Sequence, residues 1–264
     1  MELPIYQVDA FADAVFKGNP AAIMPLEQWL DDAMLQAIAM ENNLSETAYL
    51  VKNDSGYDLR WFTPQVEVDL CGHATLAAAH VLFNHLDYAG DEIAFNTRSG
   101  ELRVKYSATG LTLDFPAKEL VTTDVDLAVC NALGAIASEA VVPANNPSQA
   151  LYVYEFEEDL ARLKPDFPAL LAASEHCIIA TAPGDNCDFV SRFFGPQVGV
   201  DEDPVTGSAH CSLVPYWAGR LHLNELQARQ ISARGGSLSC ELRDGRVFMT
   251  GTAVTFMVGV VTLG

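Results

Sequence analysis

The sequence predicts an α+β protein built from two similar halves, and three observations carry this prediction. The first is an internal repeat, in which residues 60–69 (RWFTPQVEVD) and 192–201 (RFFGPQVGVD) agree at seven of ten positions. The second is an apolar segment that opens with Gly after each copy, and the third is a predicted hairpin beyond each segment. Because the period, 192 − 60 = 132, is half of the 264 residues, it indicates two similar halves rather than a solenoid.

The first half begins with a strand-like segment at residues 3–9 and another at 21–24. Between them, Gly18-Asn-Pro20 has turn chemistry, and we expect a structural role for it. Acidic residues at 31–32 favour a helix start, which residues 42–43 can end. Two more strands are expected at 44–51 and 57–62, joined by a turn, with Glu46 near the start of the first.

Each half then contains a helix expected to be buried. Residues 72–83 are apolar almost all round, which is typical of a helix covered on every side, here by the strands around it. The matching segment in the second half is residues 207–219. Predicted hairpins follow at 101–115 and at 238–250, starting 29 residues (101 − 72) and 31 residues (238 − 207) beyond the two helix starts. The duplication therefore extends well past the repeated motif.

We place the boundary between the halves in residues 116–124, which show little periodicity. The first half is then residues 1–118 and the second is residues 119–251. Within the second half we expect a helix at 125–134 and strands near 151–154, 176–181 and 187–194. The last run, residues 252–264, is β-branched and apolar, so we expect a buried strand that returns to the first half.

Composition excludes several classes of protein. An apolar content of 50% excludes disorder, and a net charge of −20 argues against nucleic-acid and anionic membrane partners. The six cysteines form no C-x-x-C pair, and neither a secretory signal nor a bilayer-spanning apolar run is evident. We therefore expect reduced thiols in a cytoplasmic protein.

Both helix starts are candidate anion sites. A helix opened by Gly presents free backbone N–H groups and the positive end of its dipole, and this suits a carboxylate. Gly72 and Gly207 open the two helices, and His73 and Ser208 follow them. Six steps separate Asp201 from Gly207, against three from residue 69 to Gly72, so we place Asp203 in a three-residue insertion. The alternative is that both glycines serve only turns and close packing.

Several motifs resemble the PhzF (phenazine-biosynthesis) isomerase family. They lie in the family's order along the chain: Gly18-Asn-Pro20, Asn43-Leu-Ser-Glu-Thr47, Phe62-Thr-Pro64, Gly72-His-Ala-Thr75 and Glu202-Asp-Pro-Val-Thr-Gly-Ser-Ala209. The resemblance implies a diaminopimelate-epimerase-like fold, with two pseudo-symmetric halves that each wrap a β-barrel-like sheet around a central buried helix. It also implies a homodimer and no cofactor.

The resemblance assigns roles to particular residues. Glu46 corresponds to the family's general acid/base, and His73 and Asp203 to its other catalytic residues. Gly72, Gly207 and Ser208 correspond to substrate-binding positions at the two helix starts. Where epimerase relatives place a Cys before each Gly, this chain has Cys71 and then Thr206. A Thr hydroxyl is no base near neutral pH, so two-base racemisation by that route is not expected, and we expect Cys71 to be a packed thiol.

The expected function is a cofactor-independent isomerase. It would move a proton on a small unsaturated carboxylate held between the two halves, with Glu46 as general acid/base. One alternative is an amino-acid or hydroxy-acid epimerase or racemase with a different second base, and another is a non-catalytic binding protein on the same fold. His73 could also simply cap its helix, and Asp203 could be a turn residue. No metal site is expected, because His73 and His80 share a helix face without a third ligand at recognisable spacing.

Overall fold

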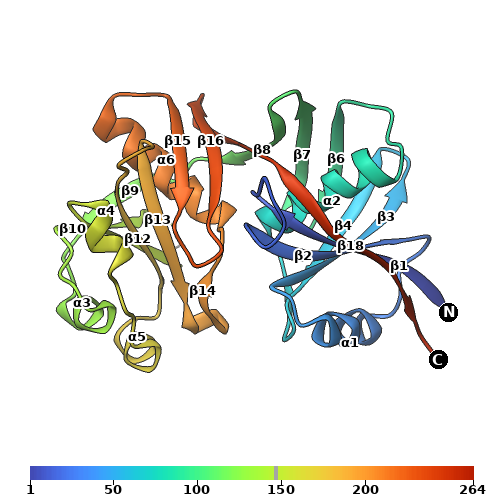
Figure 1. Ribbon diagram of the computed structural model, residues 1–264, viewed down its shortest axis with the longest axis horizontal. Helices are drawn as coiled ribbons and strands as arrows, with labels where there is room; N and C mark the ends of the chain where they lie inside the picture. Colours follow the sequence, from blue (N-terminus) through green and yellow to red (C-terminus); the bar gives the residue numbers. More distant parts are fainter. Residues whose placement is uncertain (146–147) are drawn as a thin grey trace. The chain divides into compact units, whose positions relative to one another are not determined.

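The computed structural model describes residues 1–145 and 148–264, and the chain divides into two compact units, each considered by itself here (Figure 1). Unit 1 is Met1–Asp114 with Thr250–Gly264, and unit 2 is Phe115–Met249. The first boundary lies four residues before the expected one (118 − 114). Residues 117 and 118 fall in unit 2 because their backbone N–H groups donate to the carbonyls of Gly245 and Cys211.

Unit 1 contains one large set of strands and two helices, α1 (Asp32–Asn42) and α2 (Gly72–His85). Its strands are β1 (Glu2–Ala10), β2 (Asn19–Leu26), β3 (Glu46–Asn53), β4 (Gly56–Phe62), β5 (Glu67–Val68), β6 (Glu92–Thr97), β7 (Gly100–Ser107), β8 (Gly110–Pro116) and β18 (Ala253–Thr262). Strand β8 runs through the first unit boundary.

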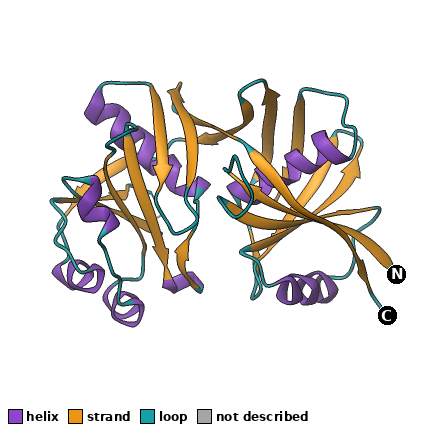
Figure 2. Cartoon of the chain, viewed as in Figure 1, coloured by secondary structure: helices purple, strands orange, loops and turns teal. Residues whose placement is uncertain are grey.

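Helix α2 is the core of unit 1, as the sequence predicts. Ten of its residues are buried, and it packs against β1, β2, β3, β7 and β18 (Figure 2). The alanines at 77–79 are fully buried and let the strands approach the helix closely. No side chain caps its first turn, so the N–H groups there have no side-chain acceptor at the cap position.

Helix α1 connects two parallel strands and thereby positions Glu46. The Asp31 carboxylate caps its start by accepting from the N–H of Met34 at 2.9 Å, and Asn43, in the left-handed conformation, ends it. Parallel pairing of β2 with β3 then sets Ala21 opposite Glu46. The Glu46 carboxylate is therefore carried by the first residue of a central strand, β3.

Strand β18 corrects one expectation. It pairs antiparallel with β1, from Glu2 opposite Thr262 to Ala10 opposite Ala253, so it does belong to unit 1. It is not buried, however, and consecutive apolar residues at 256–258 are exposed. The reason is that α2 covers only part of β18, and the Phe16 ring that contacts Phe256 is itself exposed.

Unit 2 has a second long central helix, α6 (Gly207–Leu221), and shorter helices that cover its sheet. These are α3 (Leu127–Leu133), α4 (Glu157–Ala161), α5 (Phe167–Ala173) and the 3₁₀ turn η1 (Pro196–Val198). Its strands are β9 (Leu120–Thr123), β10 (Glu139–Pro143), β11 (Gln149–Val153), β12 (Cys177–Pro183), β13 (Phe189–Gly195), β14 (Val200–Asp203), β15 (Glu225–Gln230), β16 (Gly236–Arg243) and β17 (Arg246–Gly251). Strand β17 runs through the second boundary.

Strand register corrects the position of the insertion. Phe62 pairs with Glu67 in unit 1, and Phe194 pairs with Glu202 in unit 2. The first connection takes five steps and the second eight, so the three extra residues lie before Glu202, in the turn that contains η1. From each of these glutamates to the helix glycine is five steps. Asp203 is therefore not inserted, and it takes the place that Val68 has in unit 1.

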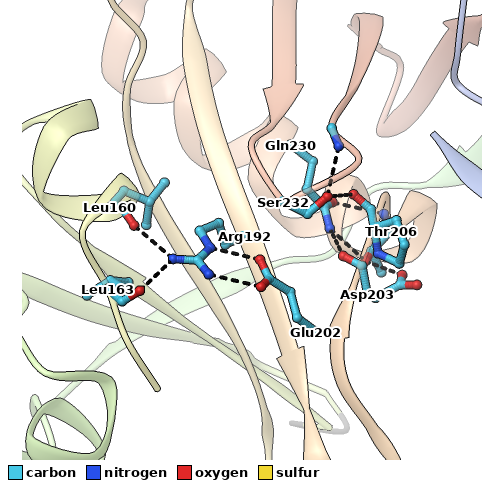
Figure 3. Close-up of polar contacts among 10 residues, drawn as sticks. Leu160, Leu163, Arg192, Glu202, Asp203, Thr206, Gln230 and Ser232 are labelled. Atoms are coloured by element: carbon cyan, nitrogen blue, oxygen red, sulfur yellow. Dashed lines mark hydrogen bonds and ion pairs between the residues drawn. The ribbon is translucent and has the colours of Figure 1, made fainter. Parts of the chain in front are cut away.

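The repeated arginines form matching clamps. Arg60 makes two 2.7 Å hydrogen bonds to the Glu67 carboxylate. Arg192 binds Glu202 in the same bidentate way, at 2.8 and 2.9 Å, and also donates to the carbonyls of Leu160 and Leu163 (Figure 3). Bidentate geometry fixes the angle between the paired strands as well as their separation. Each clamp thus holds the short strand that leads to a central helix.

Among the described residues, no helix combines the length and the apolarity needed to cross a membrane. All six cysteines are free thiols, and five of them are buried.

Candidate active site

The centre of the site in unit 1 is a contact between Glu46 and His73. Glu46 is the first residue of β3, and His73 lies in the first turn of α2. The Nε2 atom of His73 is 3.0 Å from the Oε2 atom of Glu46, and the two side chains are only 5% and 17% exposed. At this distance the angle is poor for a hydrogen bond, and neither atom has another hydrogen-bond partner among the described residues. Both atoms therefore keep hydrogen-bonding capacity for a ligand.

The other ring nitrogen of His73 faces Asn19. The Nδ2 atom of Asn19 is 3.2 Å from Nδ1 of His73, and the Oδ1 atom accepts from the Ser45 hydroxyl at 3.1 Å. In this orientation Nδ1 is an acceptor, so a neutral ring holds its proton on Nε2. The nitrogen beside Glu46 then carries the hydrogen.

Charge and burial act in opposite directions on His73. Burial favours the neutral ring, while the Cys71 sulfur and the Glu46 carboxylate favour the imidazolium, and the balance raises the pKa of His73 above 6.5. Cys71 lies 3.5 Å from Nδ1, but burial raises the pKa of its thiol, which is therefore neutral near pH 7. Cys71 and Glu46 together raise the pKa of His73, and Asn19 opposes them by presenting a donor to Nδ1. In either protonation state Nε2 carries a hydrogen.

Glu46, Cys71 and His73 form the one group of candidate metal ligands among the described residues, with ligand atoms within 4.8 Å of one another. The sulfur lies beside Nδ1 and the carboxylate beside Nε2. An imidazole binds one ion through one nitrogen, and here the two close partners of His73 lie beside different nitrogens. The arrangement suits proton transfer better than metal binding.

Asp203 ends β14 in unit 2, where a hydrogen-bonded loop holds it. The Thr206 hydroxyl donates to the Asp203 carboxylate, and the buried amide of Gln230 contacts both residues (Figure 3). Gln230 donates to the carbonyl of Asp203 at 2.6 Å and accepts from the N–H of Thr206 at 2.9 Å. Ser232 closes the loop by donating to the carbonyl of Pro204. This loop fixes both Asp203 and the start of α6.

The start of α6 resembles that of α2. Gly207 opens the helix, and no side chain caps its first turn. The Ser208 hydroxyl oxygen accepts from Nε2 of Gln149 at 3.3 Å, and Oε1 of Gln149 accepts from the Lys118 ammonium at 3.0 Å. Uncapped N–H groups and a hydroxyl at a helix start provide donors for an anion.

Register identifies which residues of unit 2 take the places of Glu46 and His73. Thr47 pairs with Phe62 and Ile178 with Phe194, so Cys177 occupies the position of Glu46. Counting from the helix glycine, Ser208 occupies that of His73. Burial, followed by the negative charge of Asp203, raises the pKa of Cys177, so this thiol is a poor base near neutral pH. In unit 2, therefore, Cys177 and Ser208 stand in place of Glu46 and His73.

The structure brings Glu46, Gly72 and His73 together in unit 1, and Asp203, Gly207 and Ser208 around the start of α6 in unit 2. Sequence reasoning did not find the residues that hold these site residues in place by hydrogen bonds. Asn19 was expected in a structural turn, yet it contacts His73, and only its place in a family motif pointed to more. Gln149, Gln230 and Lys118 carry no local signal. Strand pairing brings the two glutamines to the site, and a backbone hydrogen bond to Cys211 in α6 brings Lys118 there.

Comparison with known proteins gives the family. The profile described as "Phenazine biosynthesis-like protein" (PhzC-PhzF) matches residues 8–259. The chain belongs to this family. An uncharacterized isomerase of Pseudomonas aeruginosa is 52% identical to it, with 100% of both chains covered. A crystal structure of a PhzF family protein of Enterococcus faecalis is 47% identical with a TM-score of 0.96, again covering 100% of both chains.

The fold is wider than the family. A hydroxyproline epimerase of Agrobacterium vitis superposes with a TM-score of 0.60 at 11% identity, over 98% of this chain and 92% of the other, and shares the fold alone. The predicted diaminopimelate-epimerase-like α+β fold is confirmed by these neighbours. Since close relatives are named isomerases, the protein is an enzyme of the isomerase or epimerase type.

Proposed function

We propose that the protein is a cofactor-independent isomerase that moves a proton along a small unsaturated carboxylate, with Glu46 as the general acid/base. The observation that carries this proposal is the buried Glu46–His73 contact beside the uncapped start of α2. A carboxylate in such a place can accept a proton from one carbon and give a proton to another. His73 and the N–H groups of α2 supply hydrogen-bond donors for negative charge that develops on the substrate.

The reaction follows from one base. Glu46 removes a proton from a saturated carbon next to the double bond, and the C–H electron pair forms a new double bond as the old one shifts. The protonated Glu46 then gives a proton to the far carbon, and because its side chain is 17% exposed this proton can exchange with solvent between the two steps. Negative charge collects on the substrate carboxylate between these steps, where His73 Nε2–H can donate to it. No electrons leave or enter the substrate, so no redox partner is needed.

We assign substrate binding to Gly72, Gly207 and Ser208 through the donors at the two helix starts, and an active-site role to Asp203. The hydrogen bond from Thr206 fixes the Asp203 carboxylate near the start of α6, and we assign to it the binding of an amine or hydroxyl of the substrate. A two-base epimerase is less well supported, because Cys177 stands where a second Glu would be and its pKa is raised. Asp203 could still serve as a second base, and product stereochemistry decides this point.

The test is an NMR exchange screen in D₂O. Wild type, Glu46→Gln and the control Glu41→Gln, an exposed Glu of α1, are incubated with unsaturated cyclic and acyclic amino and hydroxy carboxylates, including the phenazine precursor. We expect deuterium uptake and double-bond migration with wild type and control, and a loss of at least roughly 10²-fold in rate with Glu46→Gln. Undiminished exchange in Glu46→Gln would refute the role of Glu46, and inverted configuration would select the epimerase.

A further inference from the structure

Lys118 is a half-buried cation without a carboxylate partner. Its ammonium donates to Oε1 of Gln149, and no acidic side chain of the described chain pairs with it. The two residues outside the described set are Asn146 and Pro147, and neither is acidic. An ionisable group that acts on its charge is the Cys211 thiol, whose pKa burial raises to about 11, so it is neutral near pH 7. In a chain with 35 acidic and 15 basic residues, an unpaired Lys is unusual.

The surroundings hold Lys118 in place although burial disfavours its positive charge. Its backbone N–H donates to the carbonyl of Cys211 in α6 at 2.9 Å, which fixes the chain against that helix. Burial lowers the pKa of the ammonium, since it disfavours the charged form. Gln149, the first residue of β11, is 7% exposed and has its amide between Lys118 and Ser208. The three side chains therefore form one hydrogen-bonded row.

The direction of this row follows from donor and acceptor chemistry. An ammonium can only donate, so Lys118 must face the oxygen of the Gln149 amide. The amide nitrogen is then left to face Ser208, and it can only donate as well. The Ser208 oxygen must accept, and its own hydroxyl hydrogen is left to point elsewhere. Lys118 thus excludes the opposite arrangement, in which the Ser208 hydroxyl would donate to Gln149.

We propose that Lys118 and Gln149 are positioning residues that hold Ser208 as a hydrogen-bond donor for a substrate carboxylate at the start of α6. The proposal rests on the proposed function, because it takes a carboxylate as the ligand. A hydroxyl with its hydrogen committed outward favours an anion over a neutral amide of the same shape. The positive charge of Lys118 adds to this preference through the polarised amide of Gln149.

The experiment compares cyclohex-1-ene-1-carboxylate with its carboxamide, each titrated into the full chain and followed by NMR. The variants are Ser208→Ala, Gln149→Met, Lys118→Met and the double variant Gln149→Met with Ser208→Ala. The control is Lys164→Met, which removes an exposed Lys of the same unit. Chemical denaturation of each variant shows whether its fold is retained.

We expect wild type and control to prefer the acid, and Gln149→Met to weaken acid binding by about tenfold, the worth of one hydrogen bond to a charged group. Lys118→Met should weaken it by less, since the Gln149 amide can still take either orientation. In the Ser208→Ala background, Gln149→Met should weaken acid binding no further, which a general structural role would not produce.

Three results would overturn the inference. They are a wild type without preference for the acid, equal weakening of acid and amide by Gln149→Met, and additive effects of Gln149→Met and Ser208→Ala. The two proposals fail separately. Exchange that does not depend on Glu46 refutes the proposed function. The ratio of the affinities for acid and carboxamide tests only whether Lys118 and Gln149 position Ser208.

Discussion

Gln230→Leu should loosen the loop that carries Asp203. Gln230 is 1% exposed at the end of β15, and its amide makes three hydrogen bonds to the 203–206 segment. Leu fills a similar volume but leaves the N–H of Thr206 and the carbonyl of Asp203 without their partner. Each unpaired buried group costs roughly 1–3 kcal/mol, and since the Asp203 carbonyl is only partly buried we expect a loss of about 3 kcal/mol in unfolding free energy.

The assay is urea unfolding, combined with hydrogen exchange at the Thr206 amide. Gln227→Leu is the matched control, because Gln227 lies on the same strand but is exposed. We expect the control to change the unfolding free energy by less than about 0.5 kcal/mol and to leave Thr206 exchange unchanged. If Gln230→Leu destabilises no more than the control, or if Thr206 stays equally protected, the loop does not depend on Gln230 and the reasoning is wrong.

Two further predictions concern His73 and assembly. The raised pKa of His73 means that its protonated form stabilises the folded state fully below about pH 6.5, and that this contribution is lost as pH rises through the folded pKa. Glu46→Gln should lower the pKa read from the His73 NMR titration and flatten the pH dependence of unfolding, and an unchanged titration would contradict the assignment to Glu46. The protein should also be a homodimer that uses the exposed apolar residues of β18, so Val258→Lys should favour the monomer by light scattering relative to the control Val121→Lys, and equal masses for both variants would contradict this.

Sequence reasoning predicted the elements well wherever a local rule applied. The apolar run from Gly72 gave a buried helix, and Asp31 with Asn43 gave the ends of α1. It failed at β18, where apolar composition predicted burial and the neighbouring residues cover the strand only in part. It also misplaced the insertion, because the repeat could be aligned forward from Arg192 or backward from Gly207, and only strand pairing chooses between them.

The sequence by itself determined the duplication, the two Gly-opened helices and the family to which the motifs belong. These are local or repetitive patterns, and backbone propensity and burial of apolar faces are enough to express them. The tertiary structure alone decided that Glu46 meets His73, that Asn19 stands behind His73, and that Lys118 and Gln149 stand behind Ser208. The physical reason is that strand register places Asn19, Glu46 and Gln149, and one residue of slip would turn each of these side chains to the opposite face.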